Sequence, residues 1–514
     1  MTKQTSSYFT IRMTRALEDN AFATGITISD MMEVAGKVVA EEVEKFAKSV
    51  SSKNVVVFAG YGNNGGDGVV AIRYLLQKNY ECSLVLFGDK NKFDSLASQE
   101  KFKKLDEILP QKKITYVKKL DQVEKVFDNL EKDVIIVDAL LGIGITGIPR
   151  EPFKSVINYL NSKYKGNLIA LDIPSGYNPE TENELYIRNA NKIVCLGRNK
   201  IQEGDFPKAE VIVREIGIPI DSERYVGIGD LKWFFPKRPD DSHKRQNGVV
   251  TVIAGSKDYI GAPALAGMGA FRTGIDLVFI LTPTDIRNTV ASFKPDFITI
   301  PAHEGEIESS DIIRMYKLAR LKGSTFIIGP GMMETETTKE TLLELLRDKE
   351  KRNIIIDASA LSMMDEEHLF LLKYHNTVIT PHRGEFAKIF KRKLTGNIEE
   401  DCSIISEVAA KWQTTILLKG QLDIISDGNG TKINKTGHSG MTVGGTGDIL
   451  TGIVAALLSV NNEPFISACL AAYISGKAGE LASEKYGVGL MASDIPENIW
   501  KVIDSALKFK AKEI

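Results

Sequence analysis

Short runs of aliphatic and β-branched residues alternate with longer amphipathic stretches along almost the whole of this 514-residue chain. The apolar runs that indicate strands lie at 55–59, 83–87, 134–138, 168–172, 192–196 and 210–213, and then at 249–254, 276–281, 325–329, 353–357, 377–380, 414–419 and 422–426. Uninterrupted apolar strands separated by helical patterns are typical of parallel sheets that helices cover on both faces. The sequence therefore predicts an α/β fold.

The alternation breaks once, near the middle of the chain. Residues 216–219 and 234–239 follow neither the strand period nor the helix period, and the length suggests about two to four domains. We therefore predict two α/β domains, at 1–220 and 226–514, joined by a short linker. Long helices are expected near 448–460, 464–485 and 493–508, and Ser29 is expected to cap an early helix.

Charge and cysteine usage argue against several classes of protein. Lys and Arg total 65 and Asp and Glu total 67, so the net charge of −2 lacks the cationic excess of a general nucleic-acid binder. The four cysteines show no metal-ligand or disulfide-framework spacing. Segment 1–20 lacks the apolar core of a secretory signal, and the longest apolar run, 449–460, is too short to span a bilayer. We expect a cytoplasmic protein that binds neither nucleic acid nor membrane.

Polar, glycine-rich segments follow three strands of the first domain. The run 55–59 leads into GYGNNGGDG at 60–68, the run 134–137 into DALLGIGITG at 138–147, and the run 168–171 into DIPSG at 172–176. In an open parallel sheet, ligands bind beyond the carboxyl ends of the strands, so these loops should face one crevice. Glycine lets backbone N–H groups approach a phosphate, and carboxylates that lie together need a cation or a shared proton.

Two simpler interpretations of these loops stay open. Both 60–65 and 142–147 match GxGxxG, and the first match, with Asp89 after the next strand, could be a dehydrogenase fingerprint. The glycines could also do no more than form tight turns. Tight turns leave five polar residues of the crevice unexplained, namely Asn63, Asn64, Asp67, Asp138 and Asp172.

Together these motifs resemble the NAD(P)H-hydrate epimerase domain, or YjeF N-terminal domain, over about residues 9–217. The resemblance implies a Rossmann-like parallel sheet whose crevice binds the hydrated dinucleotide. It implies that Asp172 is the acid–base residue beside the nicotinamide ring. It also implies a potassium ion bound by Asn64, Asp138 and Ser175. The implied hydrate-binding residues are Asn63, Asn64, Gly65, Gly66, Asp67, Gly142, Ile143, Gly144, Ile145, Thr146, Gly147, Ile148 and Asp172.

In the second domain, the glycine-rich segment TGHSGMTVGGTGD at 436–448 precedes an apolar helix. It is not a Walker A sequence, because no Lys-Ser/Thr pair follows the glycines. Its N–H groups and the helix start could nevertheless face bound phosphates. Asp448 could accept the proton of a hydroxyl that attacks phosphorus, or it could be a plain helix N-cap. His438 lies in the same segment, and its role stays open.

This segment, with GSKDYIGAPALAGMGAFRTG, IIGPGM, TPHRGEF and LLKG, resembles the ADP/ATP-dependent NAD(P)H-hydrate dehydratase domain of the ribokinase-like superfamily, over about residues 226–510. The implied hydrate-binding residues are Ala262, Gly331, His382 and Asp448. The implied nucleotide-binding residues are Lys419, Gly420, Gln421, Leu422, Asp423 and Gly447, with magnesium beside the nucleotide. The residues that depart from the usual family pattern are His438, Arg383, Ser359 and Asp423.

The two resemblances together imply a bifunctional enzyme that repairs hydrated nicotinamide nucleotides. The first domain would interconvert the R and S forms of NADHX and NADPHX. The second would phosphorylate the S form and eliminate phosphate, which restores NADH or NADPH. ADP is the expected donor and ATP the alternative, because members of the family with both domains on one chain favour ADP. A homo-oligomer is expected.

Two rival functions remain open on the sequence alone. One is a small-molecule kinase with an accessory nucleotide-binding domain, which would release a stable phosphorylated product. The other is a nucleotide-sensing protein without turnover. The presence of both Asp172 and Asp448 argues against this second rival.

Overall fold

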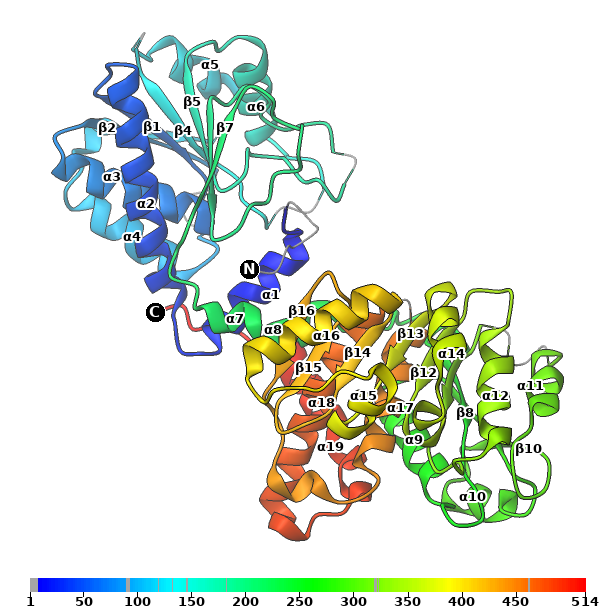
Figure 1. The fold of residues 1–514 in the computed structure, drawn as a ribbon. Coiled ribbons are helices and arrows are strands. Elements are labelled where there is room, and N and C mark those ends of the chain that lie inside the picture. The colour runs from blue at the N-terminus through cyan, green and yellow to red at the C-terminus, as the bar shows by residue number, and fades with distance from the viewer. Residues whose placement is uncertain are drawn as a thin grey trace. The chain divides into compact units, whose positions relative to one another are not determined.

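The computed structural model describes residues 8–88, 93–118, 120–131, 133–144, 147–181, 183–318, 321, 323–460 and 463–514. The chain forms two compact units, in each of which helices surround a sheet (Figure 1). Of the described residues, the N-terminal unit comprises Tyr8–Ile220 together with Lys510–Ile514, and the C-terminal unit comprises Asp221–Phe509. The last five residues of the sequence therefore return to the N-terminal unit, a placement that the sequence did not predict.

The N-terminal unit is built on a wholly parallel, seven-stranded sheet in the order β3-β2-β1-β4-β5-β6-β7. Its strands are β1 (Asn54–Ala59), β2 (Glu81–Phe87), β3 (Ile114–Val117), β4 (Ile135–Ala139), β5 (Asn167–Leu171), β6 (Lys192–Leu196) and β7 (Glu210–Arg214). Its helices are α1 (Ile11–Phe22), α2 (Ile28–Ser49), α3 (Asn63–Gln77), α4 (Leu96–Asp106), η1 (Gln111–Lys113), α5 (Leu120–Asp128) and α6 (Phe153–Ser162). Residues of β1 alternate between two cores, since Val55 and Val57 join one cluster and Val56 and Phe58 the other. Both faces of this sheet are therefore covered, as its apolar runs predict.

The C-terminal unit is built on a nine-stranded sheet in the order β10-β9-β8-β11-β12-β13-β14-β15-β16. Pairing is parallel from β10 to β14 and antiparallel from β14 to β16. Its strands are β8 (Val249–Ile253), β9 (Leu277–Thr282), β10 (Ile298–Pro301), β11 (Thr325–Ile328), β12 (Asn353–Ile356), β13 (Asn376–Ile379), β14 (Thr415–Leu418), β15 (Asp423–Ser426) and β16 (Thr431–Asn434). Here too β8 supplies two cores, with Val250 and Val252 on one face and Val249 and Ile253 on the other.

Helices of the C-terminal unit follow most of these strands, and α7 begins at the boundary between the units. They are α7 (Ile220–Arg224), α8 (Ile228–Phe234), α9 (Ala262–Arg272), α10 (Arg287–Phe293), α11 (Ser309–Tyr316), α12 (Glu336–Leu346), α13 (Ala358–Ser362), α14 (Glu366–Leu371), η3 (Leu372–Tyr374), α15 (Arg383–Phe390), α16 (Ile398–Trp412), η4 (Ser439–Thr442), α17 (Thr446–Ser459), α18 (Pro464–Tyr486), η5 (Gly487–Gly489), η6 (Ala492–Asp494) and α19 (Pro496–Leu507). Helix α17 contains most of the longest apolar run of the sequence, residues 449–460. No helix in the described part of the chain is long and apolar enough to cross a membrane.

The sequence analysis missed three strands and misplaced one helix cap. The missed strands, β3, β10 and β16, all lie at sheet edges, where a strand need not be apolar on both faces. The predicted cap Ser29 is wrong, because the N-cap of α2 is Thr27. Thr27 Oγ1 accepts a hydrogen bond from the Asp30 N–H, and the Asp30 carboxylate accepts one from the Thr27 N–H. This reciprocal capping box places the helix start before Ser29.

Helices α9 and α17 pack unusually closely, and their first turns carry predicted site residues. A Cβ atom on Gly452 of α17 would overlap the carbonyl oxygen of Ala266, and one on Gly269 of α9 would overlap that of Ile449. Only glycine therefore permits this backbone approach. The close contact fixes Asp448, at the start of α17, relative to Ala262, at the start of α9.

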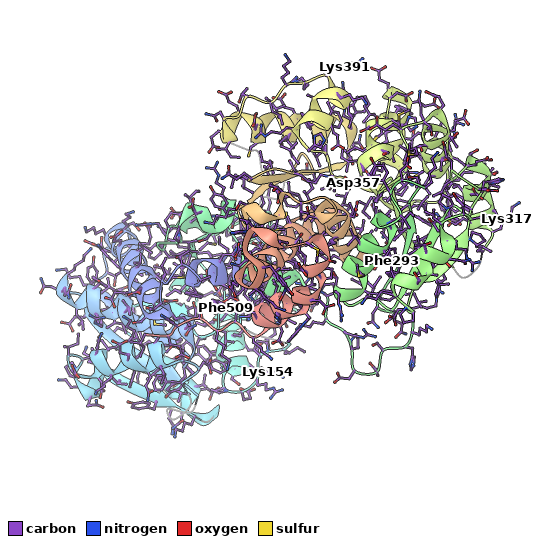
Figure 2. The ribbon with its side chains drawn as sticks, turned by 90° about the horizontal axis from the view of Figure 1, so that it is seen from below. Lys154, Phe293, Lys317, Asp357, Lys391 and Phe509 are labelled. Carbon is purple, nitrogen blue, oxygen red and sulfur yellow. The ribbon has the colours of Figure 1, made fainter. Side chains whose placement is uncertain are left out.

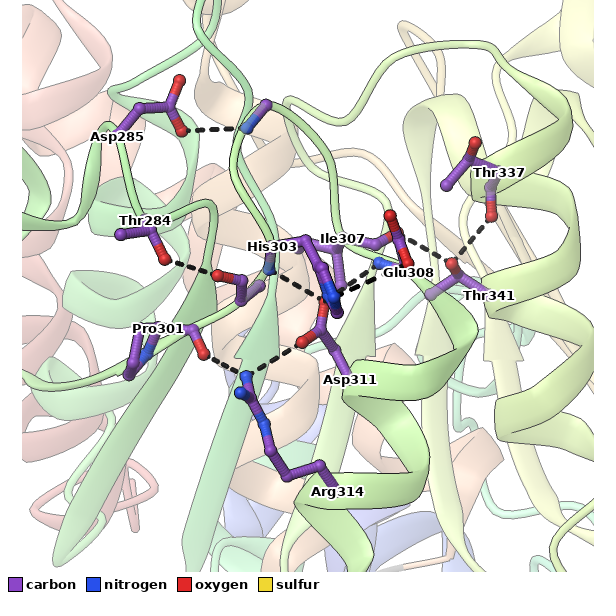
Figure 3. A network of polar contacts seen from close by, with 12 residues as sticks. Thr284, Asp285, Pro301, His303, Ile307, Glu308, Asp311, Arg314, Thr337 and Thr341 are labelled. Atoms are coloured by element: carbon purple, nitrogen blue, oxygen red, sulfur yellow. Dashed lines mark hydrogen bonds and ion pairs between the residues drawn. The ribbon is translucent and has the colours of Figure 1, made fainter.

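A network of hydrogen bonds and ion pairs lies at the end of β10, the edge strand of the second sheet (Figure 3). The Asp311 carboxylate is fully buried and accepts hydrogen bonds from the backbone N–H groups of His303 and Glu308, both at 3.1 Å. It also forms ion pairs with His303 Nδ1 at 3.0 Å and with an Arg314 guanidinium nitrogen at 2.9 Å. The hydrogen bond to Asp311 raises the pKa of His303. These contacts tie α11 to the end of β10.

We expect Gly452→Ala to destabilise the C-terminal unit. Alanine has the better helix propensity, so propensity alone predicts a gain of about 1 kcal/mol. Overlap with the Ala266 carbonyl should outweigh that gain and lower the free energy of unfolding by about 1–3 kcal/mol. Urea unfolding measures this, and Gly489→Ala is the matched control because nothing lies within 4 Å of its added Cβ. A more stable Gly452→Ala protein would contradict the steric argument.

Candidate functional site

Three loops meet at the carboxyl ends of neighbouring strands β1, β4 and β5. The Ser175 hydroxyl donates to Asp138 Oδ1 at 2.5 Å, and the Ser175 N–H donates to Asp138 Oδ2 at 2.8 Å. The Asn64 side-chain amide donates to the Leu141 carbonyl oxygen at 3.2 Å. The structure thus brings Asn64, Asp138 and Ser175 together with one backbone carbonyl, in the arrangement expected of strand ends in a parallel sheet.

The oxygen atoms of this cluster suit a hard cation. Burial raises the pKa of Asp138 to about 6, although hydrogen bonds from Ser175 and Leu140 oppose that rise. Within the described ranges, no group of three or more His, Cys, Asp or Glu side chains could hold a metal. An ion here would therefore be bound by one carboxylate with hydroxyl, amide and carbonyl oxygens, a donor set that suits potassium better than a transition metal.

Asp172 and Lys200 form a buried ion pair in the same unit. Lys200 Nζ lies 2.5 Å from Asp172 Oδ1, and the Leu196 N–H donates to the same oxygen at 3.1 Å. Burial alone would lower the pKa of Lys200, but the charge and the hydrogen bond of the Asp172 carboxylate together raise it. Asp172 itself has a φ of 66°, a conformation that non-glycine residues rarely adopt. Such backbone strain is common at functional sites.

Two more carboxyl groups surround this ion pair. Burial raises the pKa of Asp67 well above its ordinary value, and the charges of Asp172 and Glu18 add to the rise. Burial also raises the pKa of Glu18 to about 7, although Lys200 opposes the rise. Glu18 can therefore hold a proton close to neutral pH.

Glu18 was not predicted from the sequence. It lies on α1, between the buried residues Leu17 and Asp19 and one turn before the buried Ala21. A carboxylate within the buried part of a helix was the available signal, because such a group needs a partner.

The glycines of the predicted hydrate loops are required mainly by packing. A Cβ on Gly65 would overlap the Gly60 carbonyl oxygen, and one on Gly142 would lie 3.1 Å from Asn64 Cβ. One on Gly66 would lie 2.5 Å from the sulfur of Met32. These three glycines are therefore required by close packing, and Gly65 and Gly66 lie in the first turn of α3 and not in a tight turn.

The other residues that were predicted to bind the hydrate either belong to the loop after β4 or fall outside the described residues. The Ile143 carbonyl accepts a hydrogen bond from Arg15 at 3.3 Å, and a Cβ on Gly144 would lie 3.7 Å from the Arg15 guanidinium. Gly147 and the exposed Ile148 line an open groove with residues 183–185. Ile145 and Thr146 lie outside the described residues, as does Asp89 of the dehydrogenase alternative.

In the C-terminal unit, an ion pair lies beneath the start of α17. Lys419, after β14, places Nζ 2.7 Å from Oδ1 of the buried Asp357, which follows β12 (Figure 2). A Cβ on Gly447 would lie 3.5 Å from Lys419 Nζ and 3.8 Å from Asp357 Oδ2. The predicted nucleotide residues Lys419 and Gly447 therefore adjoin each other. Asp357 is their partner, and the sequence analysis did not include it among the site residues.

Asp448 is not the N-cap of α17, so that alternative is wrong. The N-cap is Gly445, whose φ of 96° favours glycine, and Asp448 is the third helical residue. No described residue donates a hydrogen bond to the Asp448 carboxylate. Burial raises its pKa to about 7, the charge of Asp357 adds to the rise and Lys419 opposes it. Asp448 is therefore a carboxyl group whose pKa lies near neutral pH and whose charge interacts with that of Lys419.

Ala262 and Gly331 adjoin each other at the same edge. A Cβ on Gly331 would lie 2.9 Å from Ala262 Cβ, and Gly331 has a φ of 65°. The Ser359 hydroxyl donates to the Met332 carbonyl at 2.6 Å, so this departure from the family pattern holds the Gly331 loop. The exposed His382 caps α15, where its Nδ1 accepts from the N–H groups that follow, and its backbone pairs with Lys419.

The other departures also have local structural partners. Asp423 accepts from the Gly420 N–H at 3.0 Å and from the Asn434 amide at 2.9 Å, which shapes the hairpin that contains Gln421 and Leu422. Burial raises the pKa of Asp423 to about 6. Arg383, the first residue of α15, pairs with the buried Asp401 at 2.8 Å. His438 Nδ1 accepts from the Gly440 N–H at 3.1 Å.

Two family models match separate parts of the chain. Residues 28–201 match the model of the family described as YjeF-related protein N-terminus, and residues 250–501 match that of NAD(P)H-hydrate dehydratase. The chain is 36% identical over 500 residues to the bifunctional NAD(P)H-hydrate repair enzyme Nnr of Methanothermobacter thermautotrophicus, a match that covers 95% of this chain and 94% of the relative. It is 34% identical to the enzyme of that name from Archaeoglobus fulgidus, over 96% of this chain and 98% of the relative.

Two further matches cover the second half alone. The ADP-dependent (S)-NAD(P)H-hydrate dehydratase of Cenarchaeum symbiosum is 38% identical over 53% of this chain and 94% of the relative. The solved ADP/ATP-dependent NAD(P)H-hydrate dehydratase from Bacillus subtilis, co-crystallized with ATP/Mg²⁺, is 26% identical over 55% of this chain and 98% of that chain, with a TM-score of 0.46.

The family models and the full-length relatives confirm both resemblances that the sequence motifs indicate. The structure confirms the predicted α/β fold class, with two units that are each built on a wholly or largely parallel sheet. Because the full-length relatives match almost the entire chain at more than 30% identity, the chain belongs to the family of bifunctional NAD(P)H-hydrate repair enzymes.

Proposed function

We propose that the N-terminal unit epimerises the R and S forms of NADHX and NADPHX, and that the C-terminal unit dehydrates the S form with ADP as phosphoryl donor. The observation that carries the proposal is a pair of separate clusters of acidic residues, one near the carboxyl ends of the parallel strands in each sheet. Each has a Lys–Asp ion pair and a further carboxyl group whose pKa is raised to about 7, Glu18 in one and Asp448 in the other.

Epimerisation requires the hydroxyl on C6 of the reduced ring to leave and return on the other face. The proton of an acid converts that hydroxyl into water, and the ring nitrogen lone pair stabilises the cation left at C6. Water then adds to either face and gives a proton back. We assign this proton transfer to Asp172, with Lys200 fixing its orientation through the 2.5 Å contact.

Potassium would be held by Asn64, Asp138 and Ser175, whose oxygen atoms fit it. When bound, the ion would supply positive charge beside the buried Asp138 carboxylate. The residues of this cluster already link the loops after β1, β4 and β5 through their own hydrogen bonds.

Dehydration requires a better leaving group than hydroxide. We assign to Asp448 the removal of the C6 hydroxyl proton as that oxygen bonds to the terminal phosphorus of the donor and the bond to the nucleotide breaks. Loss of phosphate from C6 and of a proton from C5 then restores the ring double bond. Lys419 and the N–H groups at the start of α17 would face the transferred phosphate.

Magnesium commonly binds one or two carboxylates together with substrate phosphates. Asp357 and Asp448 are the carboxylates that face this position, so the residues fit a magnesium ion that arrives with the nucleotide. When bound, it would neutralise phosphate charge.

Substitution of the two acids should separate the activities. Asp172→Asn should lower the epimerisation rate by about 10²–10⁴-fold and leave S-hydrate dehydration intact. Asp448→Asn should lower dehydration by about the same factor and spare epimerisation. Chromatography of the R and S hydrates measures the first activity, and absorbance of the reduced nicotinamide measures the second.

The control for both substitutions is Asp285→Asn, which removes an exposed carboxylate in the C-terminal unit. It should leave both rates unchanged. Equal loss of both activities in either acid variant would contradict the assignment of separate acids, and a normal rate in Asp448→Asn would contradict its role as base.

The pH dependence of dehydration should report Asp448. Because the base acts in its deprotonated form, kcat/KM should rise about tenfold per pH unit below a pKa near 7 and level off above it. The residual activity of Asp448→Asn should lack this rise. A wild-type profile that is flat through neutral pH, with normal folding, would contradict the assignment.

We expect ADP to be preferred over ATP. The donor's terminal phosphorus must reach the hydroxyl beside Asp448, and a pocket that stops at the second phosphate selects ADP. The name of the Cenarchaeum symbiosum relative, which is ADP-dependent, supports this choice. Measurement of kcat/KM with each nucleotide at saturating S-hydrate decides it, with AMP as the expected product. A clear preference for ATP would refute the donor assignment, and a stable phosphorylated product would favour the kinase alternative.

A further inference from the structure

The last residues of the sequence contact the starts of two helices in the N-terminal unit. The carbonyl oxygens of Lys512 and Glu513 accept hydrogen bonds, both 3.0 Å long, from the N–H groups of Ile28 and Ser29 in the first turn of α2. The Glu513 carboxylate accepts one from the N–H of Leu96, the first residue of α4. Figure 1 marks this end of the chain beside α2. These first-turn N–H groups have no acceptor within their own helices.

Contacts continue from these two helices to the start of α3. Ser95, the N-cap of α4, donates from its hydroxyl to Asn63 Oδ1 at 2.6 Å, and Ser98 donates to the same oxygen at 3.1 Å. The Ser29 hydroxyl donates to the Glu100 carboxylate at 3.1 Å, which joins α2 to α4. The starts of three helices therefore form one hydrogen-bonded cluster.

Asn63 is the predicted hydrate-binding residue that this cluster holds. It is exposed at the first position of α3, directly after the glycine turn, and two serine hydroxyls fix its side-chain oxygen. With its oxygen occupied in this way, the amide nitrogen points away from the serines and remains available as a donor. Without these contacts an exposed asparagine samples several rotamers, which would weaken its contact with a ligand.

We infer that Glu513 is a positioning residue of the epimerase site. A carboxylate is favoured at a helix N-terminus, and here it fixes the first turn of α4. That turn carries Ser95, which in turn holds the Asn63 side chain in one orientation. The inference rests on the proposed function, because it takes Asn63 as part of the hydrate site. It assigns to the end of the dehydratase sequence a role in the other reaction.

The test compares three variants of the full chain. Removal of residues 510–514 and the substitution Glu513→Gln should each raise the KM of epimerisation about three- to tenfold, because the first removes the hydrogen bond to Leu96 and the second removes the charge that strengthens it. The kcat of epimerisation and the kcat/KM of dehydration should change less than about twofold, because neither Asp172 nor the C-terminal unit is altered. Lys510→Gln removes a charge from the same segment without removing a described contact and should match the wild type.

Amide hydrogen exchange gives a second measure that does not depend on activity. Leu96 and the first turn of α3 should exchange faster in Glu513→Gln than in Lys510→Gln. Absence of epimerisation in the wild type would reject the proposed function itself. If the wild type epimerises, an unchanged KM in the truncated chain, or a loss confined to kcat, would overturn the positioning role, and so would an equal loss of both activities.

Discussion

Parallel strand pairing determines where charge can lie in this molecule. Aliphatic side chains cover both faces of each sheet, so an ionised group on a strand needs a partner, as Lys192 at the start of β6 has in Glu42 at 3.0 Å. Because the parallel strands of a sheet all point the same way, the loops that follow them gather along one edge. Asp138 lies in the last residues of β4, Asp172 follows β5, and Asp357 and Lys419 follow β12 and β14. The charged residues of the two candidate sites therefore lie at the carboxyl ends of neighbouring strands, one group in each sheet.

Each site contains a buried lysine–aspartate ion pair, but the acid assigned to catalysis belongs to that pair in only one of them. In the N-terminal unit, the acid assigned to catalysis is itself the partner of the lysine, and Lys200 holds Asp172 in a strained backbone conformation. In the C-terminal unit, Lys419 pairs with Asp357 and leaves Asp448 free of hydrogen-bond donors among the described residues. Lys200 can fix the orientation of Asp172 through their contact, whereas a pKa near 7 suits Asp448 to a base that changes protonation state during turnover.

Most of this organisation follows from local sequence signals. A strand buried on both faces leaves a continuous apolar run, which is why the central strands were predicted, whereas the edge strands β3, β10 and β16 have mixed runs and were missed. Loops after buried strands were predicted for the same reason. The partners that were missed depend on distant parts of the chain, since Glu18 enters from α1 and Asp357 meets Lys419 across 62 residues. Whether Asp448 caps α17 stayed open on the sequence, because no local signal shows that a left-handed glycine, Gly445, begins the helix.

The chain leaves the N-terminal unit at Ile220 and re-enters it at Lys510, so the dehydratase unit is topologically an insertion within the epimerase unit. During ribosomal synthesis, every strand of the epimerase sheet emerges before the first residue of the inserted unit. Thr27 and Ser95 cap α2 and α4 locally, but the acceptors for the N–H groups of Ile28, Ser29 and Leu96 emerge only after that whole unit has been made. These three hydrogen bonds therefore form only once translation has passed through the dehydratase unit, and a chain cut at the domain boundary lacks them.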